Sequence, residues 1–308
     1  MRVFLTGASG GIGSAVLPEL LSGGHEVVAL VRSDASAEAV TAAGATALRG
    51  DLTDSDSLRA GAEQADGVIH LAFNNDFTNI QKSITEETVA IETFGSALKG
   101  SGKPFVVASG TPFVPGRTST EDDPMAVDGP MGGRGRNAQA VLDLAQEGVR
   151  SATVRLPRSV HAADGRFGFA SFLVATAQRT GVSGFVRDGS QRWPAVHRLD
   201  AARLFRLVLE NGAPGTVAHA VADEGDTMLS LAEIIGRRLG LPVEAVPAES
   251  FGFLGTIFAL DQPSSSVVTR EKFDWQPTPP RAFSKTSRTG SIPPERTGLN
   301  RPHAAGSS

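Results

Sequence analysis

The chain lacks cysteine, tyrosine and any apolar run long enough to cross a membrane, and each absence excludes a type of structure or chemistry. Without cysteine there is no disulfide framework and no thiolate chemistry, which fits a cytoplasmic protein. The longest apolar stretch, residues 251–260, is interrupted by glycine and threonine and falls short of the ~18 residues that a membrane-spanning helix needs. The first residues do not have the composition of a signal peptide. We therefore expect a cytoplasmic protein without a membrane partner.

An excess of charge of one sign is also missing. The 308 residues carry 29 Lys and Arg against 33 Asp and Glu, a formal net charge of −4, which argues against nonspecific binding to nucleic acid. The composition is 40% hydrophobic, which is typical of a globular chain with one large core or with two domains. We expect a small molecule as the partner and no metal ion; a homodimer stays open.

Short apolar runs alternate with helical patterns over the first half of the chain. The expected strands are residues 3–5, 27–31, 67–72, 105–108 and 152–156. The expected helices are residues 12–22, 35–43, 55–62, 79–99 and 136–147. Strands that alternate with helices at this spacing predict an α/β fold with a Rossmann-like, doubly wound parallel sheet.

The pattern loosens after residue 156, which suggests a second, smaller part. We predict a nucleotide-binding Rossmann domain over 1–160, to which later strands return, and a mostly substrate-binding region over 161–278. Its expected helices lie near 168–181, 200–211 and 230–240. Residues 279–308 are rich in Pro, Ser, Gly and Arg, a composition that favours a disordered tail.

A glycine-rich turn stands between the first strand and the first helix. In this position glycines allow a tight turn, a close approach of pyrophosphate to the backbone, and packing of the helix on the sheet. The helix amides then point at the anion. The predicted contacts to a dinucleotide are Gly7, Ser9, Gly10, Gly11, Ile12 and Gly13.

The end of the second strand bears on the choice of cofactor. An acidic residue there would bind the adenosine ribose 2′-hydroxyl, whereas an arginine accommodates a 2′-phosphate. The strand is followed by Arg32, which can pair with phosphate, and Ser33, which can add a hydroxyl donor. These residues favour NADP(H). Asp34 keeps NAD(H) open, since a small backbone shift would aim its carboxylate at the ribose.

The spacing Gly7-x-x-Gly10-x-x-Gly13 and several later motifs resemble the short-chain dehydrogenase/reductase superfamily. The resemblance is to its extended and atypical branch, the NAD-dependent epimerases and 3-beta-hydroxysteroid dehydrogenase-like proteins, and covers about residues 1–278. The later motifs are residues 50–52, 70–73, 108–111, 155–161 and 192–200. The resemblance implies further cofactor contacts: Asp51 and Leu52 along the adenine, Leu71, Ala72 and Phe73 beside the ribose and nicotinamide, and Ser109.

Most members of that superfamily use a Ser or Thr together with a Tyr-x-x-x-Lys pair. Thr111 matches the Ser/Thr position, but Met131 and Gly135 stand where the Tyr and Lys are expected. Arg134 and Arg136 flank the Lys position and are poor proton donors. The usual proton route is therefore closed, and another group has to neutralise the developing oxyanion.

Two histidines are the titratable candidates for that role. His161 and His197 lie in matching motifs and can work near neutral pH, so the catalytic candidates are Thr111, His161 and His197. For each histidine a structural role, bonded to the backbone, is the competing interpretation. If one of them supplies the proton, activity should titrate near the unperturbed pKa of ~6.5.

The candidate substrate residues are four. Asn74 and Asn75 follow the fourth strand and could orient a substrate oxygen or cap a helix, and Arg192 and Trp193 are expected over the pocket, with Trp193 alternatively in the core. We expect Asp200 to be the N-cap of a helix.

Three functions compete. The first is an NADP-dependent oxidoreductase that acts on a carbonyl or hydroxyl group of a small organic substrate by a non-Tyr proton route. The second is an epimerase, dehydratase or isomerase that uses bound NAD(P). The third is a nonenzymatic NADP-binding regulator. The missing Tyr and Lys favour the second and third, whereas Thr111, the glycine turn and the substrate region favour the first.

Overall fold

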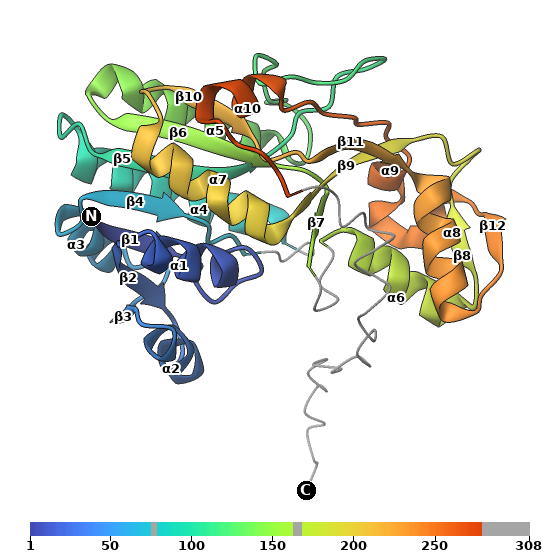
Figure 1. Cartoon of the computed structure of the whole chain (residues 1–308), viewed down its shortest axis with the longest axis horizontal. Coiled ribbons are helices and arrows are strands. Elements are labelled where there is room, and N and C mark those ends of the chain that lie inside the picture. Colours follow the sequence, from blue (N-terminus) through green and yellow to red (C-terminus); the bar gives the residue numbers. More distant parts are fainter. Residues whose placement is uncertain (75–78, 163–167, 279–308) are drawn as a thin grey trace, which may run out of the picture.

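The computed structural model describes residues 1–74, 79–162 and 168–278 (Figure 1). Its centre is a seven-stranded sheet in the order β10-β6-β5-β4-β1-β2-β3, and every neighbouring pair of strands is parallel. The strands are β1 (Arg2–Thr6), β2 (Glu26–Val31), β3 (Thr46–Arg49), β4 (Gly67–His70), β5 (Pro104–Gly110), β6 (Arg150–Leu156) and β10 (Thr216–His219). This order confirms the expected Rossmann-like, doubly wound α/β fold.

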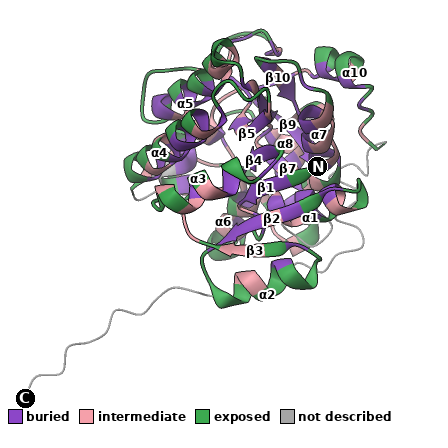
Figure 2. Ribbon diagram, turned by 90° about the vertical axis from the view of Figure 1, so that its left-hand side faces the viewer, coloured by how far each residue is buried: buried purple, intermediate pink, exposed green. Residues whose placement is uncertain are grey.

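Helices cover both faces of this sheet, as Figures 1 and 2 show. Helices α1 and α7 pack together on one face, and α3, α4 and α5 form the layer on the other. Helix α2 lies beside the edge strand β3. The bounds are α1 (Gly13–Ser22), α2 (Asp34–Ala42), α3 (Ser55–Glu63), α4 (Ile80–Leu98), α5 (Gly132–Asp143) and α7 (Arg198–Asn211), with a short 3-10 helix at Leu144–Glu147.

The apolar first strand, β1, contributes side chains to the cores on both faces of the sheet. Successive side chains of a strand point to opposite faces. Val3 and Leu5 therefore join the core under α1 and α7, while Phe4 joins the core under α3 and α4; all three are fully buried. Gly61 of α3 lies directly on the Phe4 ring, where a Cβ would come within 2.4 Å of a ring carbon.

The smaller part is built from two further sheets, β11-β9-β7 and β12-β8. Its elements are β7 (Ser159–His161), β8 (Ser183–Phe185), β9 (Arg192–His197), β11 (Asp223–Thr227), β12 (Val243–Ala245), α6 (Ala170–Thr180), α8 (Met228–Leu239), a 3-10 helix (Ala248–Leu254) and α9 (Gly255–Phe258). The chain then ends its described course with α10 (Val267–Phe273) against α7 and β10. The domain boundary at residue 160 stays a prediction, and the predicted disordered tail lies outside the described residues.

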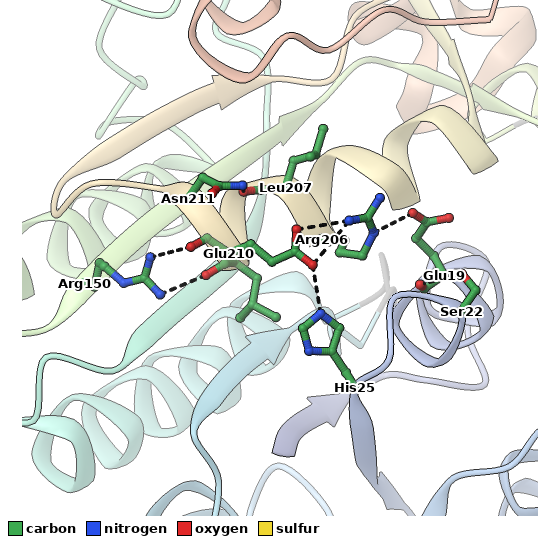
Figure 3. Close-up of polar contacts among 9 residues, drawn as sticks. Glu19, Ser22, His25, Arg150, Arg206, Leu207, Glu210 and Asn211 are labelled. Carbon is green, nitrogen blue, oxygen red and sulfur yellow. Dashed lines mark hydrogen bonds and ion pairs between the residues drawn. The ribbon is translucent and has the colours of Figure 1, made fainter. Parts of the chain in front are cut away.

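A partly buried polar cluster joins α1 to α7 at the amino ends of the strands (Figure 3). Arg206 donates from Nε to Glu19 at 2.8 Å and from Nη1 to Glu210 at 3.0 Å. His25, just before β2, contacts the same Glu210 carboxylate at 2.9 Å. Arg150 donates to the backbone carbonyl of Glu210 at 3.0 Å. The cluster lies at the sheet edge opposite the glycine turn, so it fixes α7 without taking part in the candidate site.

Buried histidines predict that the fold loses stability in mild acid. Burial lowers the pKa of His70 to about 3 and the pKa values of His161 and His219 to about 4. In the unfolded chain the same groups bind protons near pH 6.5, so the unfolded state takes up more protons between pH 6.5 and 4. The free energy of unfolding should therefore fall as the pH drops through this window, by up to about 1.4 kcal/mol per pH unit for each histidine.

Urea titrations at pH 7, 6 and 5 measure this slope. Carboxyl groups whose pKa is raised by burial, such as Glu87, Asp223 and Asp226, act in the opposite direction, so the readout is the difference in slope between wild type and His219→Gln. The variant should lose part of the wild-type slope. Equal slopes would show that His219 is not neutral in the fold.

Candidate functional site

The carboxyl ends of four strands of the main sheet lie on the same side of the fold, which is called the sheet edge below. The glycine turn follows β1, residues 71–74 follow β4, Thr111 follows β5 and Arg158 comes shortly after β6. The strand order switches sides between β1 and β4, with β2 and β3 on one side of β1 and β4 to β6 on the other. Ligands of open α/β sheets bind outside the carboxyl ends of the strands at such a point. The residues predicted from separate motifs therefore share one edge of the fold.

The glycine turn is built so that side chains are excluded. Gly7 has φ +74°, and a Cβ there would lie 2.8 Å from the Ala72 amide nitrogen. A Cβ on Gly13 would lie 2.0 Å from the Gly7 carbonyl oxygen. Gly10 donates its amide to that same carbonyl at 3.0 Å and so closes the turn. Above Gly11 nothing lies within 4 Å of a Cβ position, and Ser9, Gly10 and Gly11 are exposed.

Helix α1 starts at this turn without a capping side chain. Helices α2, α3 and α4, in contrast, begin at the capping residues Ser33, Asp54 and Asn79. An uncapped first turn leaves amide donors and a partial positive charge for an anion. The open space above Gly11 and these amides fit a dinucleotide pyrophosphate.

The three candidate cofactor contacts that follow β2 differ in their exposure and in their partners. Arg32 is exposed directly after the strand. Ser33 caps α2 by accepting the Ser36 amide at 3.2 Å, and its hydroxyl donates to Oγ of Ser36 at 3.0 Å, so its donor is already engaged. Asp34 forms an ion pair with Arg49. Arg32 is therefore the cation at this end, and the Asp34 carboxylate already has a partner.

Asp51 occupies the loop after β3, where the adenine is expected. Its carboxylate accepts both the amide and the hydroxyl of Thr53, at 2.7 and 2.6 Å, and these bonds lower its pKa. Leu52 beside it is partly buried. The contacts of Asp51 and Leu52 with adenine stay a prediction.

The loop after β4 is tied to β1 through Thr6. The Thr6 hydroxyl accepts the Ala72 amide at 3.2 Å and lies 2.7 Å from Nδ1 of His70. Leu71, Ala72 and Phe73 are partly exposed and follow this anchor. Asn74 is exposed, whereas Asn75 lies outside the described residues.

The start of helix α5 carries other residues at the positions where the Tyr and Lys are expected. Met131 is the exposed residue before the helix, and Gly135 faces the backbone, where a Cβ would lie 2.0 Å from the Ala126 carbonyl oxygen. Arg134 points to the sheet edge instead: its guanidinium lies 4.1 Å from the centre of the Phe73 ring and donates to the Ala108 carbonyl at 3.0 Å. The cation of this helix is thus supplied one residue before the predicted Lys position.

A buried carboxyl group stands behind Arg134. Glu87 of α4 lies 3.4 Å from Nε of Arg134 and accepts Asn137 at 2.9 Å. Burial raises the pKa of Glu87, because a charged carboxylate is poorly solvated there. From the sequence, Arg134 is only a neighbour of the Lys position, and Glu87 is not identified at all, because α4 carries no motif that indicates this contact.

Thr111 is held by its backbone on both sides. Its amide donates to the Leu156 carbonyl at 3.0 Å, and its carbonyl accepts Nε2 of Gln262 at 2.6 Å. Thr111 and Ser109 are both nearly buried at the end of β5. The fixed backbone leaves the Thr111 hydroxyl with only its side-chain rotation, which suits a group that must orient a substrate oxygen.

The histidine predictions need correction. His161 is 3% exposed, and burial together with the neighbouring His197 lowers its pKa to about 4, so titration near pH 6.5 is wrong for this residue. The two rings contact edge to face at 5.3 Å. His197 is the N-cap of α7, with Nδ1 accepting the Leu199 amide at 3.3 Å. The expected cap Asp200 lies instead inside the first turn, where its carboxylate accepts the Thr278 amide.

Arg192 and Trp193 separate in the structure. Trp193 is fully buried against Phe258, with ring centres 5.1 Å apart, so its prediction as a pocket wall is wrong and its core alternative holds. Arg192, the preceding residue of the strand, points to the opposite face. Its guanidinium pairs with both carboxylate oxygens of Asp261, at 3.0 and 2.8 Å. It borders a hollow of about 560 Å³ that Arg187 and Gln191 also line.

Comparisons with known proteins agree with this geometry. A family model described as NAD(P)H-binding matches residues 7–121. The uncharacterized protein C2A9.02 of Schizosaccharomyces pombe is 41% identical over 282 residues, which cover 90% of this chain and 95% of the yeast protein. A short-chain dehydrogenase/reductase superfamily protein from Agrobacterium tumefaciens with bound NAD superposes with a TM-score of 0.72 at 17% identity, over 93% of this chain and 95% of that one. The chain belongs to the same family as this yeast protein, and its fold is that of the short-chain dehydrogenase/reductase structure.

An epimerase shares the fold as well. UDP-glucose 4-epimerase from Thermotoga maritima superposes with a TM-score of 0.74 at 16% identity, over 93% of this chain and 96% of that one. This superposition shows a shared architecture, and at such low identity it leaves the reaction of this chain open. Over the described part of the chain, no helix combines the length and apolarity required to cross a membrane.

Proposed function

We propose that this chain is an NADP-dependent oxidoreductase that reduces a carbonyl group, or oxidises a hydroxyl group, of a small organic molecule in the cytoplasm. The observation that carries the proposal is the glycine turn, with its uncapped helix and open space above Gly11, beside an exposed Arg32. Arg32 supports NADP(H) over NAD(H), because a guanidinium matches a 2′-phosphate and the Asp34 carboxylate is paired with Arg49.

The residues at the sheet edge divide the work. A bound nicotinamide would supply the hydride in reduction and accept it in oxidation. The Thr111 hydroxyl donates a hydrogen bond to the substrate oxygen and fixes its orientation. Arg134 holds a positive charge beside Phe73 and stabilises negative charge that develops on that oxygen. With His161 neutral and His197 capping a helix, the proton comes from water rather than from an imidazolium.

Arg32→Glu tests the choice of cofactor. The substitution replaces a phosphate partner with a repelling charge, and loss of one charged hydrogen bond costs about 1.5–3 kcal/mol. NADPH should therefore bind about 10- to 100-fold more weakly, while NADH binding changes little. Calorimetric titration with both cofactors measures the two affinities. An equal effect on NADPH and NADH would contradict the NADP(H) assignment.

The reaction type is tested by following NADPH absorbance at 340 nm with a panel of aldehydes and ketones. An oxidoreductase consumes NADPH in step with product. If product forms without consumption, the chain is an epimerase, dehydratase or isomerase instead. If NADPH binds and no tested compound reacts, the nonenzymatic regulator gains support.

A further inference from the structure

Arg158 is a guanidinium held at the sheet edge by a neutral group. It follows β6, and its Nε donates to Oε1 of Gln262 at 2.7 Å. The rings of Phe169 and Trp193 lie 5.8 and 5.9 Å from its central carbon. An amide and two aromatic rings fix the position of the side chain, but none of them carries a full negative charge.

The charge of Arg158 therefore has no counter-ion among the described residues. Burial lowers its pKa to about 10, so it stays protonated at neutral pH. Within the described ranges, with their gaps at 75–78 and 163–167, no Asp or Glu forms an ion pair with it. Arg134 and Arg192, in contrast, have Glu87 and Asp261 as partners. A guanidinium withdrawn from water without a counter-ion is costly, and an anion that reaches it removes that cost.

One amide connects this cation to the predicted reaction centre. Gln262 accepts Arg158 with Oε1 and donates Nε2 to the Thr111 carbonyl at 2.6 Å. Gln262 is 5% exposed, and its backbone N–H donates to the Arg192 carbonyl at 2.9 Å, so its position is fixed. A molecule whose anionic group sits on Arg158 therefore has its neighbouring atoms close to Thr111.

We propose that Arg158 binds an anionic group of the substrate, a carboxylate or a phosphate, while Thr111 orients the reacting oxygen of the same molecule. The proposal rests on the proposed function for its second half. Both anions present oxygens that the two terminal nitrogens of a guanidinium can bind together. The substrate class is thus an anionic carbonyl or hydroxyl compound rather than a neutral one.

Calorimetry with simple probes tests this assignment on the full chain, with and without NADP⁺. Benzoate and phenyl phosphate distinguish carboxylate from phosphate, and benzamide is the neutral counterpart of benzoate. At least one anion should bind saturably and benzamide should not. Arg158→Gln should weaken anion binding by about 10- to 100-fold. Arg179→Gln removes an exposed charge from α6 and should bind like wild type.

The proposal is overturned if wild type binds neither anion, or if Arg158→Gln and Arg179→Gln behave alike. Should Arg158→Gln fail to fold, Arg158→Lys keeps one charge and a donor for Gln262. It should retain a preference for the anion over benzamide with weaker affinity, and loss of that preference would also overturn the proposal. NADPH titrations of the same proteins separate the two hypotheses: absent NADPH binding contradicts the proposed function, whereas intact NADPH binding without anion binding contradicts only the role of Arg158.

Discussion

Gly13→Ala should abolish tight binding of NADPH. The new Cβ would lie 2.0 Å from the Gly7 carbonyl oxygen, so the turn or the start of α1 has to move. Overpacking of this kind costs about 1–3 kcal/mol of folding free energy. The shift also misplaces the amides that face the pyrophosphate, and losing two such charged bonds lowers affinity by about 10²-fold or more. Calorimetric titration and urea unfolding measure the two effects.

Gly11→Ala is the matched control for this change. Its Cβ meets nothing within 4 Å, so the free energy of unfolding should stay within about 0.5 kcal/mol of wild type. Its NADPH affinity should exceed that of Gly13→Ala. If both variants bind NADPH as tightly as wild type, the glycine turn does not hold the cofactor.

Arg134→Gln should lower turnover by about 10²–10³-fold, the scale seen when one stabilising donor is removed from a developing oxyanion. The variant keeps a polar side chain but removes the charge beside Phe73 and the ion pair with Glu87. Steady-state kinetics with the best substrate of the carbonyl panel gives kcat and KM separately. The loss should fall mainly on kcat, because the charge acts on the transition state.

Arg136 of the same helix provides the control. It is exposed and bonds to the Val127 carbonyl, so Arg136→Gln should change kcat less than twofold, on the order of an ordinary surface substitution. Arg134→Lys should recover part of the lost turnover. His161→Gln should leave the pH dependence of turnover unchanged. Arg134→Gln turning over at the wild-type rate would remove this residue from the mechanism.

Local sequence patterns predicted five of the seven strands of the main sheet and the position of the glycine turn. Val3 to Leu5 is apolar and followed at once by glycines, and both signals depend on neighbours in the chain. The sequence did not reveal the roles of residues whose partners lie far away in the chain. Gln262 meets Thr111 from 151 positions away, and no local pattern announces that contact. Trp193 looked like a pocket wall because burial against Phe258 is decided by tertiary packing.

The helix after β5 shows the same limit on a finer scale. Counting along the sequence assigned the Lys position to Gly135, whereas the side chain that reaches the sheet edge belongs to Arg134. A shift of one residue rotates a side chain by about 100° around a helix, since a turn takes about 3.6 residues. The backbone of the loop at Ala126 packs against Gly135 and so leaves no room for a side chain at that position of the helix. This contact forms only in the folded chain.

The most direct test of the account follows the hydride itself. NADPH that carries two deuterium atoms at C4 of the nicotinamide is incubated with the chain and a carbonyl substrate, and the product is analysed by mass spectrometry. We expect one deuterium in each product molecule and one NADP⁺ formed per product. Product without deuterium, formed while the absorbance at 340 nm stays constant, would contradict net hydride transfer.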